Sequence, residues 1–186
     1  ISNWQRKEIG AIGAKLIYKN KKIQHAGVVL NLTGTAGHVN LNEKENHPGY
    51  FGRIMIQQNC SSVTGALLGI SRKTFEEVKG FDETFPIAYN DVDLCLKILE
   101  TGKLITYNPY IEAYHFESQS RGYDDTEEKQ KRLKKEEKKL KTKWKKYFEV
   151  TDKYYNPNLR TDVPNMRINP MKINSKGEER EQNEIW

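Results

Sequence analysis

Strand-like and helix-like apolar segments alternate over the first 122 residues, and this alternation constrains the fold more than any other feature. β-Branched and aliphatic residues predict strands over residues 9–18 and 23–30. The segment SVTGALLGI predicts one buried strand, and KLITYNP and IEAYHFES predict two short strands with an Asn-Pro pair between them. Strands that alternate with helices indicate an α/β domain with a mixed sheet.

Two helices are expected among these strands. Ser71 is placed to cap the short helix RKTFEEVKG, which Gly80 ends. The second helix, DVDLCLKILETG, starts after Asn90 and leaves no wide polar face, so we expect it to be largely buried. Residues 33–59 are polar and aperiodic, which predicts a long loop of the kind that is usually functional or mobile.

The composition changes sharply after Gly122. Residues 123–150 are dense in Lys and Glu and predict an amphipathic helix that docks a narrow apolar stripe and leaves its lysines in water. Residues 151–186 carry Pro and Asn with little periodicity, which predicts an extended, partly disordered tail. The helix has five apolar residues on one face: Leu133, Leu140, Trp144, Tyr147 and Phe148.

The net charge of +6 favours anionic partners, namely nucleic acid, anionic lipid or nucleotide phosphates, without choosing among them. Cys60 and Cys95 form no disulfide framework, which is typical of a reducing compartment. No apolar run approaches the roughly 18 residues of a membrane span. The first residues, ISNWQRKE, lack an initiator Met and the features of a signal peptide, which suggests a fragment.

One group of candidate functional residues is the acidic stretch NDVD. With Asn90 as the N-cap, Asp91 takes the first helical position and Asp93 the third, where the helix dipole keeps both carboxylates ionised. One interpretation is an acidic capping cluster, and the other is a general base at a helix N-terminus. The local physics does not separate the two.

A second group follows a strand in AYHFESQSRGY. His115 has the chemistry of a metal ligand and Arg121 that of a diphosphate clamp, while a satisfied strand-end His and a solvated Arg are the alternatives. Gly65 allows a ligand close to the backbone, or simply a tightly packed strand. Three further histidines have spacings that fit no metal motif and are interpreted as structural or incidental: His25, His38 and His47.

Taken in order, GAIGAKLIY, IQHAGVVLNLTGTAGH, SSVTGALLGISRKTFEEVKGFDETF, NDVDLCLKILETG and YHFESQSRG resemble family 2 glycosyltransferases. The resemblance is to members that build O-antigen and other bacterial surface polysaccharides, including rhamnosyltransferase-like ones, and covers roughly the first 160 residues. It implies part of a GT-A fold, a Rossmann-like α/β sandwich with a mixed sheet. It also implies an enzyme that transfers a sugar, with inversion, from a nucleotide-sugar to a saccharide or lipid-linked acceptor in the cytoplasm, with peripheral contact at the inner membrane face left open.

The resemblance assigns roles to residues of this chain. Asp91 matches the catalytic base that deprotonates the acceptor hydroxyl. Asn90 stands where many relatives carry an acidic residue, and Asp93 supports the same helix start. His115 matches a residue that helps to hold a divalent metal, Mg²⁺ or Mn²⁺, and Phe116 replaces a second His common there.

The substrate-binding residues also follow from the resemblance. Ser120 and Arg121 match a segment near the donor diphosphate, and Thr64 and Gly65 match a segment that lines the sugar site. The donor stays open between UDP-sugars and dTDP-rhamnose. The alternative function is a non-catalytic binding module, in which the basic helix docks on anionic lipid or nucleic acid and the carboxylates are caps. Nucleic acid is the less favoured partner, because no nucleic-acid-binding motif accompanies the helix.

The sequence departs from its relatives before Gly10. They carry a nucleotide-binding βαβ half and an Asp-x-Asp metal motif upstream, whereas the triplet of this kind here is Asp91–Val92–Asp93. We therefore expect residues 1–122 to form the acceptor-side part of the domain and the chain alone to turn over no nucleotide-sugar. A sheet edge left open by the missing strands would favour self-association.

Overall fold

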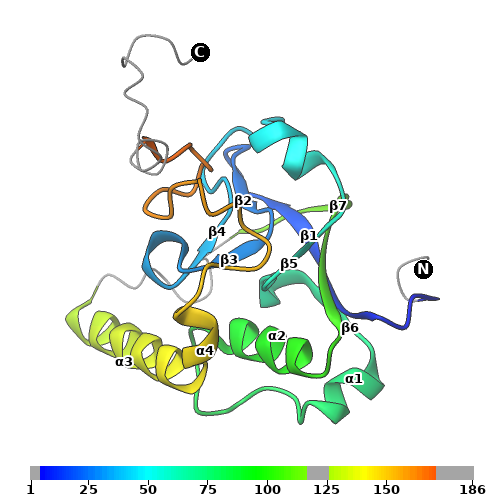
Figure 1. Cartoon of the computed structure of the whole chain (residues 1–186), viewed down its shortest axis with the longest axis vertical. Helices are drawn as coiled ribbons and strands as arrows, with labels where there is room; N and C mark the ends of the chain where they lie inside the picture. Colours follow the sequence, from blue (N-terminus) through cyan, green and yellow to red (C-terminus); the bar gives the residue numbers. More distant parts are fainter. Residues whose placement is uncertain (1–4, 117–125, 171–186) are drawn as a thin grey trace, which may run out of the picture.

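A mixed sheet forms the centre of the computed structural model, which describes residues 5–116 and 126–170 (Figure 1). The long strands β1 and β7 run parallel in the middle, and their shorter neighbours run antiparallel to them. The order is β2-β1-β7-β5, with β6 also paired to β1, and β3 and β4 form a separate two-stranded sheet. The strands span β1 Ile9–Ile17, β2 Ile23–His25, β3 Val28–Leu30, β4 Ala36–His38, β5 Gln58–Cys60, β6 Leu68–Ile70 and β7 Leu104–Tyr114.

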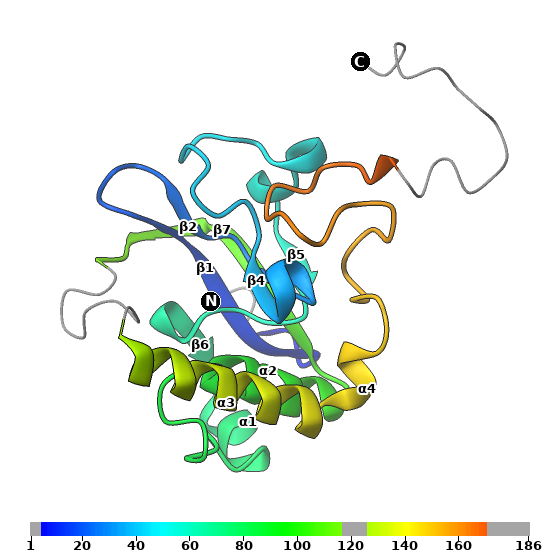
Figure 2. The ribbon, with the colours of Figure 1, turned by 90° about the vertical axis from the view of Figure 1, so that its left-hand side faces the viewer.

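The helices cover one side of this sheet, with α3 lying alongside α2 (Figure 2). The Ser71 hydroxyl accepts a hydrogen bond from the Thr74 N–H at 3.1 Å, which confirms the predicted cap of α1. Gly80 ends that segment with a φ of 61°. The helices span α1 Arg72–Glu77, α2 Asn90–Glu100, α3 Glu127–Lys143 and α4 Lys145–Phe148. This α/β arrangement with a mixed sheet and a long basic helix confirms the predicted fold class.

Two glycines of β1 let neighbouring elements approach closely. A Cβ on Gly13 would lie 2.5 Å from side-chain atoms of Val63, and one on Gly10 would lie 2.2 Å from Ile98 Cγ2. Both distances are too short for any other residue, so β1 packs directly against α2 and the chain around Val63.

The segment after α2 forms one strand, so the prediction of two strands separated at Asn108 was wrong. Asn108 pairs with Ala14, but the next β1 residue, Lys15, pairs with Glu112, so three residues bulge out between them. Pro109 lies in this bulge, where its missing N–H breaks no ladder bond. The Asn108 side chain accepts from the Tyr110 N–H at 2.9 Å and fixes the turn.

The prediction of one buried strand in SVTGALLGI was also wrong. A 3₁₀ turn at Gly65–Leu67 precedes the half-buried strand β6. The Thr64 hydroxyl accepts from the Ala66 N–H at 3.3 Å, a local bond that competes with strand pairing. The predicted loop over residues 33–59 likewise contains β4 and β5, because backbone pairing with β3 and β7 forms them despite their polar sequence.

The basic helix docks through its apolar stripe, as predicted. Leu140 and Trp144 are buried in a cluster with Leu30, Phe85, Val92 and Leu96. Where the sequence predicted an extended tail, residues 151–170 pack back on the domain with four buried side chains, and residues 171–186 lie outside the described chain. In the described part, no helix is both long and apolar enough to cross a membrane. The four buried residues of this segment are Asp152, Tyr155, Leu159 and Met166.

Candidate functional site

The start of α2 carries the Asp91 carboxylate. Tyr89 precedes the helix in a left-handed conformation (φ 61°) with no side-chain cap, and Asn90 is the first helical residue, so the prediction of Asn90 as N-cap was wrong. Asp91 Oδ2 accepts from the Gly65 N–H, and Oδ1 accepts from the Val92 N–H, each at 2.8 Å. These two hydrogen bonds therefore fix the orientation of the Asp91 carboxylate.

Asp91, Thr64 and Gly65 come together at this point. A Cβ on Gly65 would lie 3.3 Å from Asp91 Cβ, so a glycine allows the backbone its close approach to the carboxylate. Thr64 is buried and Gly65 is exposed, while Asp91 is half-buried. Each carboxylate oxygen keeps a second lone pair beyond its backbone bond, so the group can still accept a proton.

Asp93 lies on the opposite side of α2 from Asp91, because two residues along a helix correspond to about 200° of rotation. It is fully buried, and its Oδ1 accepts from the Trp144 indole N–H at 2.8 Å and lies 2.6 Å from Lys143 Nζ. Its Oδ2 lies 3.3 Å from Lys97 Nζ. Asp93 therefore joins α2 to α3 and does not share a site with Asp91.

Helix α3 also holds the segment that leads into α2. The buried Glu136 side chain accepts from the Ala88 N–H at 2.7 Å, just before the turn at Tyr89. Together with the Asp93–Trp144 bond in the first turn, this contact holds α2 at its N-terminal end. The basic helix thus braces the element that presents Asp91.

His115 lies just beyond the end of β7, where its N–H donates to the Ile17 carbonyl at 2.9 Å. Its Nδ1 is buried without a hydrogen-bond partner in the described chain. Within residues 5–116 and 126–170, no group of three or more His, Cys, Asp or Glu is placed to hold a metal ion. The described residues therefore do not by themselves form a metal site. Ser120 and Arg121 lie outside the described residues.

His25 is a component that sequence reasoning did not identify. It is fully buried at the end of β2, and its Nε2 lies 3.3 Å from the Gly27 nitrogen and 3.5 Å from the Thr64 nitrogen. Burial, followed by the positive charges that His38 and His115 can carry, holds the pKa of His25 well below its usual value. The spacing of the histidines in the sequence could not predict this contact, because Thr64 lies near His25 only in the folded chain.

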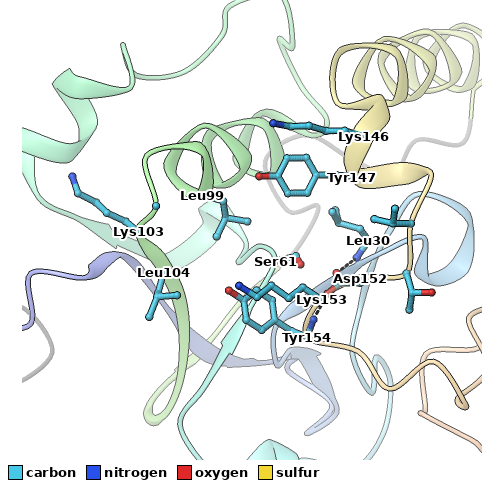
Figure 3. Close-up of a pocket in the computed structure, with 13 residues that line it drawn as sticks. Leu30, Ser61, Leu99, Lys103, Leu104, Lys146, Tyr147, Asp152, Lys153 and Tyr154 are labelled. Carbon is cyan, nitrogen blue, oxygen red and sulfur yellow. Dashed lines mark hydrogen bonds between the residues drawn. The ribbon is translucent and has the colours of Figure 1, made fainter.

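A cavity of about 410 Å³ lies elsewhere, between α4, the end of α2 and the chain that follows α4 (Figure 3). Lys103 and Lys146 line it, but each forms a 2.5 Å ion pair with a glutamate of α1 or α2. The Asp152 side chain accepts from the backbone N–H groups of Leu30 and Tyr154 (Figure 3). Because these polar groups already serve the fold, the cavity is a weaker candidate for chemistry than Asp91.

The fold and the site define an α/β protein with a mixed sheet and a backbone-anchored carboxylate at a helix start. The chain is 47% identical over 133 residues to the uncharacterized protein y4gI of Sinorhizobium fredii (strain NBRC 101917 / NGR234), a match that covers 71% of this chain. It is 38% identical over 125 residues to the O-antigen biosynthesis protein RfbC of Myxococcus xanthus, which covers 67% of this chain. The matches span 15% and 10% of those two proteins, and no family model matches.

Proposed function

We propose that the protein carrying this chain is an inverting family 2 glycosyltransferase of surface-polysaccharide synthesis, and that these residues form the acceptor side of a GT-A domain. The observation that carries the proposal is the Asp91 carboxylate, half-buried and anchored 2.8 Å from the Gly65 nitrogen. The similarity to an O-antigen biosynthesis protein supports polysaccharide synthesis as the process.

The proposed reaction assigns Asp91 the role of general base. The acceptor hydroxyl oxygen attacks the anomeric carbon, its proton passes to Asp91, and the bond from that carbon to the phosphate oxygen breaks. The nucleoside diphosphate leaves with the electron pair of this bond. The Gly65 N–H takes one lone pair of Asp91 Oδ2, so the second lone pair of that oxygen is left for the acceptor proton.

Other residues keep the roles that the resemblance gave them. Thr64 and Gly65 line the sugar site in this proposal, and Ser120 and Arg121 contact the donor diphosphate. His115 supplies one ligand to Mg²⁺ or Mn²⁺, which neutralises charge on the leaving diphosphate when bound. The buried Nδ1 of His115, which has no hydrogen-bond partner among the described residues, supports this role, and the other ligands would come from outside those residues.

The alternative of a binding module is less well supported. The apolar stripe of α3 is buried against α2 through Leu140 and Trp144, so the outer face of α3 offers charge but little apolar surface to a membrane. Contact with anionic lipid would therefore be electrostatic and peripheral. Sedimentation with vesicles that contain anionic lipid, compared with neutral vesicles, tests this contact.

Self-association through the sheet edge stays a prediction. β5 pairs with β7 only at Ile105–Tyr107, and beyond this pairing β7 exposes apolar side chains at Tyr110, Ile111 and Tyr114. We expect the chain to form dimers or larger species at high concentration. A concentration-independent monomer in analytical ultracentrifugation would contradict this expectation.

The proposed function is tested by the transferase activity of the Asp91→Asn variant, measured in the intact protein that carries this chain. We expect metal-dependent transfer from one of a panel of UDP- and dTDP-sugars, with turnover lowered by about 10³-fold in the variant, since a general base contributes about 10²–10⁴-fold. Asp162→Asn is the matched control, because Asp162 lies at the surface and, within residues 5–116 and 126–170, its ion-pair partner is Arg160. Equal turnover in Asp91→Asn and the wild type would reduce Asp91 to a structural residue, and no transfer with any donor would remove the transferase proposal.

A further inference from the structure

The His25 imidazole is the only acceptor found in the described chain for two buried backbone N–H groups, those of Gly27 and Thr64. Both distances, 3.3 and 3.5 Å, are long for hydrogen bonds, but no other partner of these two groups lies within the described residues. A buried N–H without an acceptor is strongly unfavourable, so these groups need His25.

These two donors determine the protonation of His25. A backbone N–H can only donate, so Nε2 must be unprotonated and the ring proton must lie on Nδ1. That Nδ1 faces His38 Nδ1 at 3.3 Å, and His38 Nδ1 lies closer, at 2.8 Å, to the Gln24 carbonyl, to which it donates. The two facing nitrogens are thus both donors. The Tyr107 ring of β7 lies edge-on to the His25 ring with centroids 6.4 Å apart, and His115, beyond the end of β7, is near enough to act on His25 electrostatically.

The Thr64 nitrogen connects His25 to the proposed base. Thr64 and Gly65 are consecutive, and their N–H groups bond in different directions: Thr64 toward buried His25, and Gly65 toward Asp91 Oδ2 at 2.8 Å. The Thr64 hydroxyl stiffens the turn further by accepting from the Ala66 N–H. A shift of the Thr64 backbone away from His25 therefore moves the Gly65 N–H relative to the carboxylate.

We propose that His25 is a positioning residue for Asp91: its unprotonated Nε2 anchors the Thr64 backbone, and this anchor holds the Gly65 N–H against the Asp91 carboxylate. The chain of contacts stands on geometry alone, whereas its effect on catalysis rests on the proposed function. A histidine suits the position because its rigid ring holds an acceptor, Nε2, within reach of the Thr64 N–H and a donor, Nδ1, on the other side.

Two substitutions separate this role from mere space filling. In His25→Gln the side-chain oxygen can take the place of Nε2 as hydrogen-bond acceptor. In His25→Asn the side chain is shorter, so its oxygen lies where Nδ1 was and cannot reach the Thr64 N–H. His38→Asn is the control, since His38 belongs to the same pair, but its hydrogen bonds in the described chain go to His25 and the Gln24 carbonyl and not to Thr64 or Gly65. Comparing three polar variants avoids dependence on an apolar one that fails to fold.

The first measurement is amide hydrogen exchange by NMR on the whole chain. We expect exchange at Thr64 and Gly65 to accelerate at least about 10-fold in His25→Asn relative to the β1 amides, and to stay within about 3-fold of wild type in His25→Gln and His38→Asn. Equal protection of both amides in His25→Asn and wild type would overturn the proposal. So would His25→Gln behaving like His25→Asn in a folded chain.

The second measurement is turnover of the protein as it occurs in the cell. We expect kcat to fall about 10-fold or more in His25→Asn with little change in KM, and to recover in His25→Gln. If Asp91→Asn keeps full activity while the amides respond as expected, the proposed function fails and the anchoring role of His25 stands. If Asp91→Asn is inactive while the Thr64 and Gly65 amides stay protected in His25→Asn, the positioning role fails instead.

Discussion

The bond between Asp93 and Trp144 gives the sharpest prediction about stability. Asp93 is fully buried on α2, and its Oδ1 accepts from the Trp144 indole N–H at 2.8 Å across the α2–α3 interface. The same carboxylate lies 2.6 Å from Lys143 Nζ and 3.3 Å from Lys97 Nζ. Asp93→Ala removes the shared acceptor of all three donors without altering the surface of the protein.

The expected cost follows from what each donor can do afterwards. The Trp144 N–H is buried and loses its acceptor, which costs about 1–3 kcal/mol. Lys97 and Lys143 keep 18% and 33% of their side-chain surface exposed, so water can solvate both ammonium groups again. The roughly 3–5 kcal/mol typical of breaking a fully buried pair is therefore an upper limit, and we expect about 3 kcal/mol for Asp93→Ala. Asp93→Asn keeps an acceptor and should cost about 1 kcal/mol.

Urea unfolding followed by far-ultraviolet circular dichroism measures these values without relying on tryptophan fluorescence. Trp144→Phe removes the donor and keeps most of the apolar ring, so a double-mutant cycle with Asp93→Ala isolates the bond. We expect a coupling of about 1–2 kcal/mol. A cost below about 0.5 kcal/mol for Asp93→Ala, the range of ordinary surface substitutions, would refute the reasoning. A coupling near zero would show that Trp144 is held by packing alone.

Three further predictions concern packing, pH and thiol chemistry. Gly13→Ala should destabilise the fold by about 3 kcal/mol in urea unfolding, because its Cβ would come within 2.5 Å of a buried valine; an unchanged midpoint would contradict the close contact. Hydrogen bonds, led by the one from Lys143, hold the pKa of Asp82 below its usual value, so its stabilising contribution is complete above about pH 4 and is lost as the pH falls. Asp82→Asn should therefore flatten the fall in Tm between about pH 4 and pH 2, and an unchanged slope would count against the ion pair. Burial raises the pKa of Cys95 to about 12 and also raises that of Cys60, so neither thiol should react with an aromatic disulfide reagent near pH 8 until denaturant is added.

The sequence predicted the features that depend on local patterns. The strand β1, the cap at Ser71 and the apolar stripe of α3 each follow from spacing or from capping chemistry within a few residues. The acidic start of α2 was also recognised, although Tyr89 rather than Asn90 precedes the helix. Two predictions were wrong because local features interrupt the apolar periodicity of a strand. In β7 the feature is a bulge, and around Gly65 it is the hydrogen bond from the Ala66 N–H to the Thr64 hydroxyl.

By itself, the sequence determined that this chain is an α/β protein with a carboxylate at the start of a buried helix and a basic helix that docks one face. Only the tertiary structure decided which side chains meet. The bond from Gly65 to Asp91 joins residues 26 positions apart, that from Thr64 to His25 joins residues 39 apart, and that from Trp144 to Asp93 joins residues 51 apart. Such contacts depend on how helices and turns pack on the sheet, and residue spacing along the chain contains no information about that packing. For this reason NDVD suggested a single acidic cluster, whereas the helix rotation separates Asp91 at the candidate site from Asp93 in the α2–α3 interface.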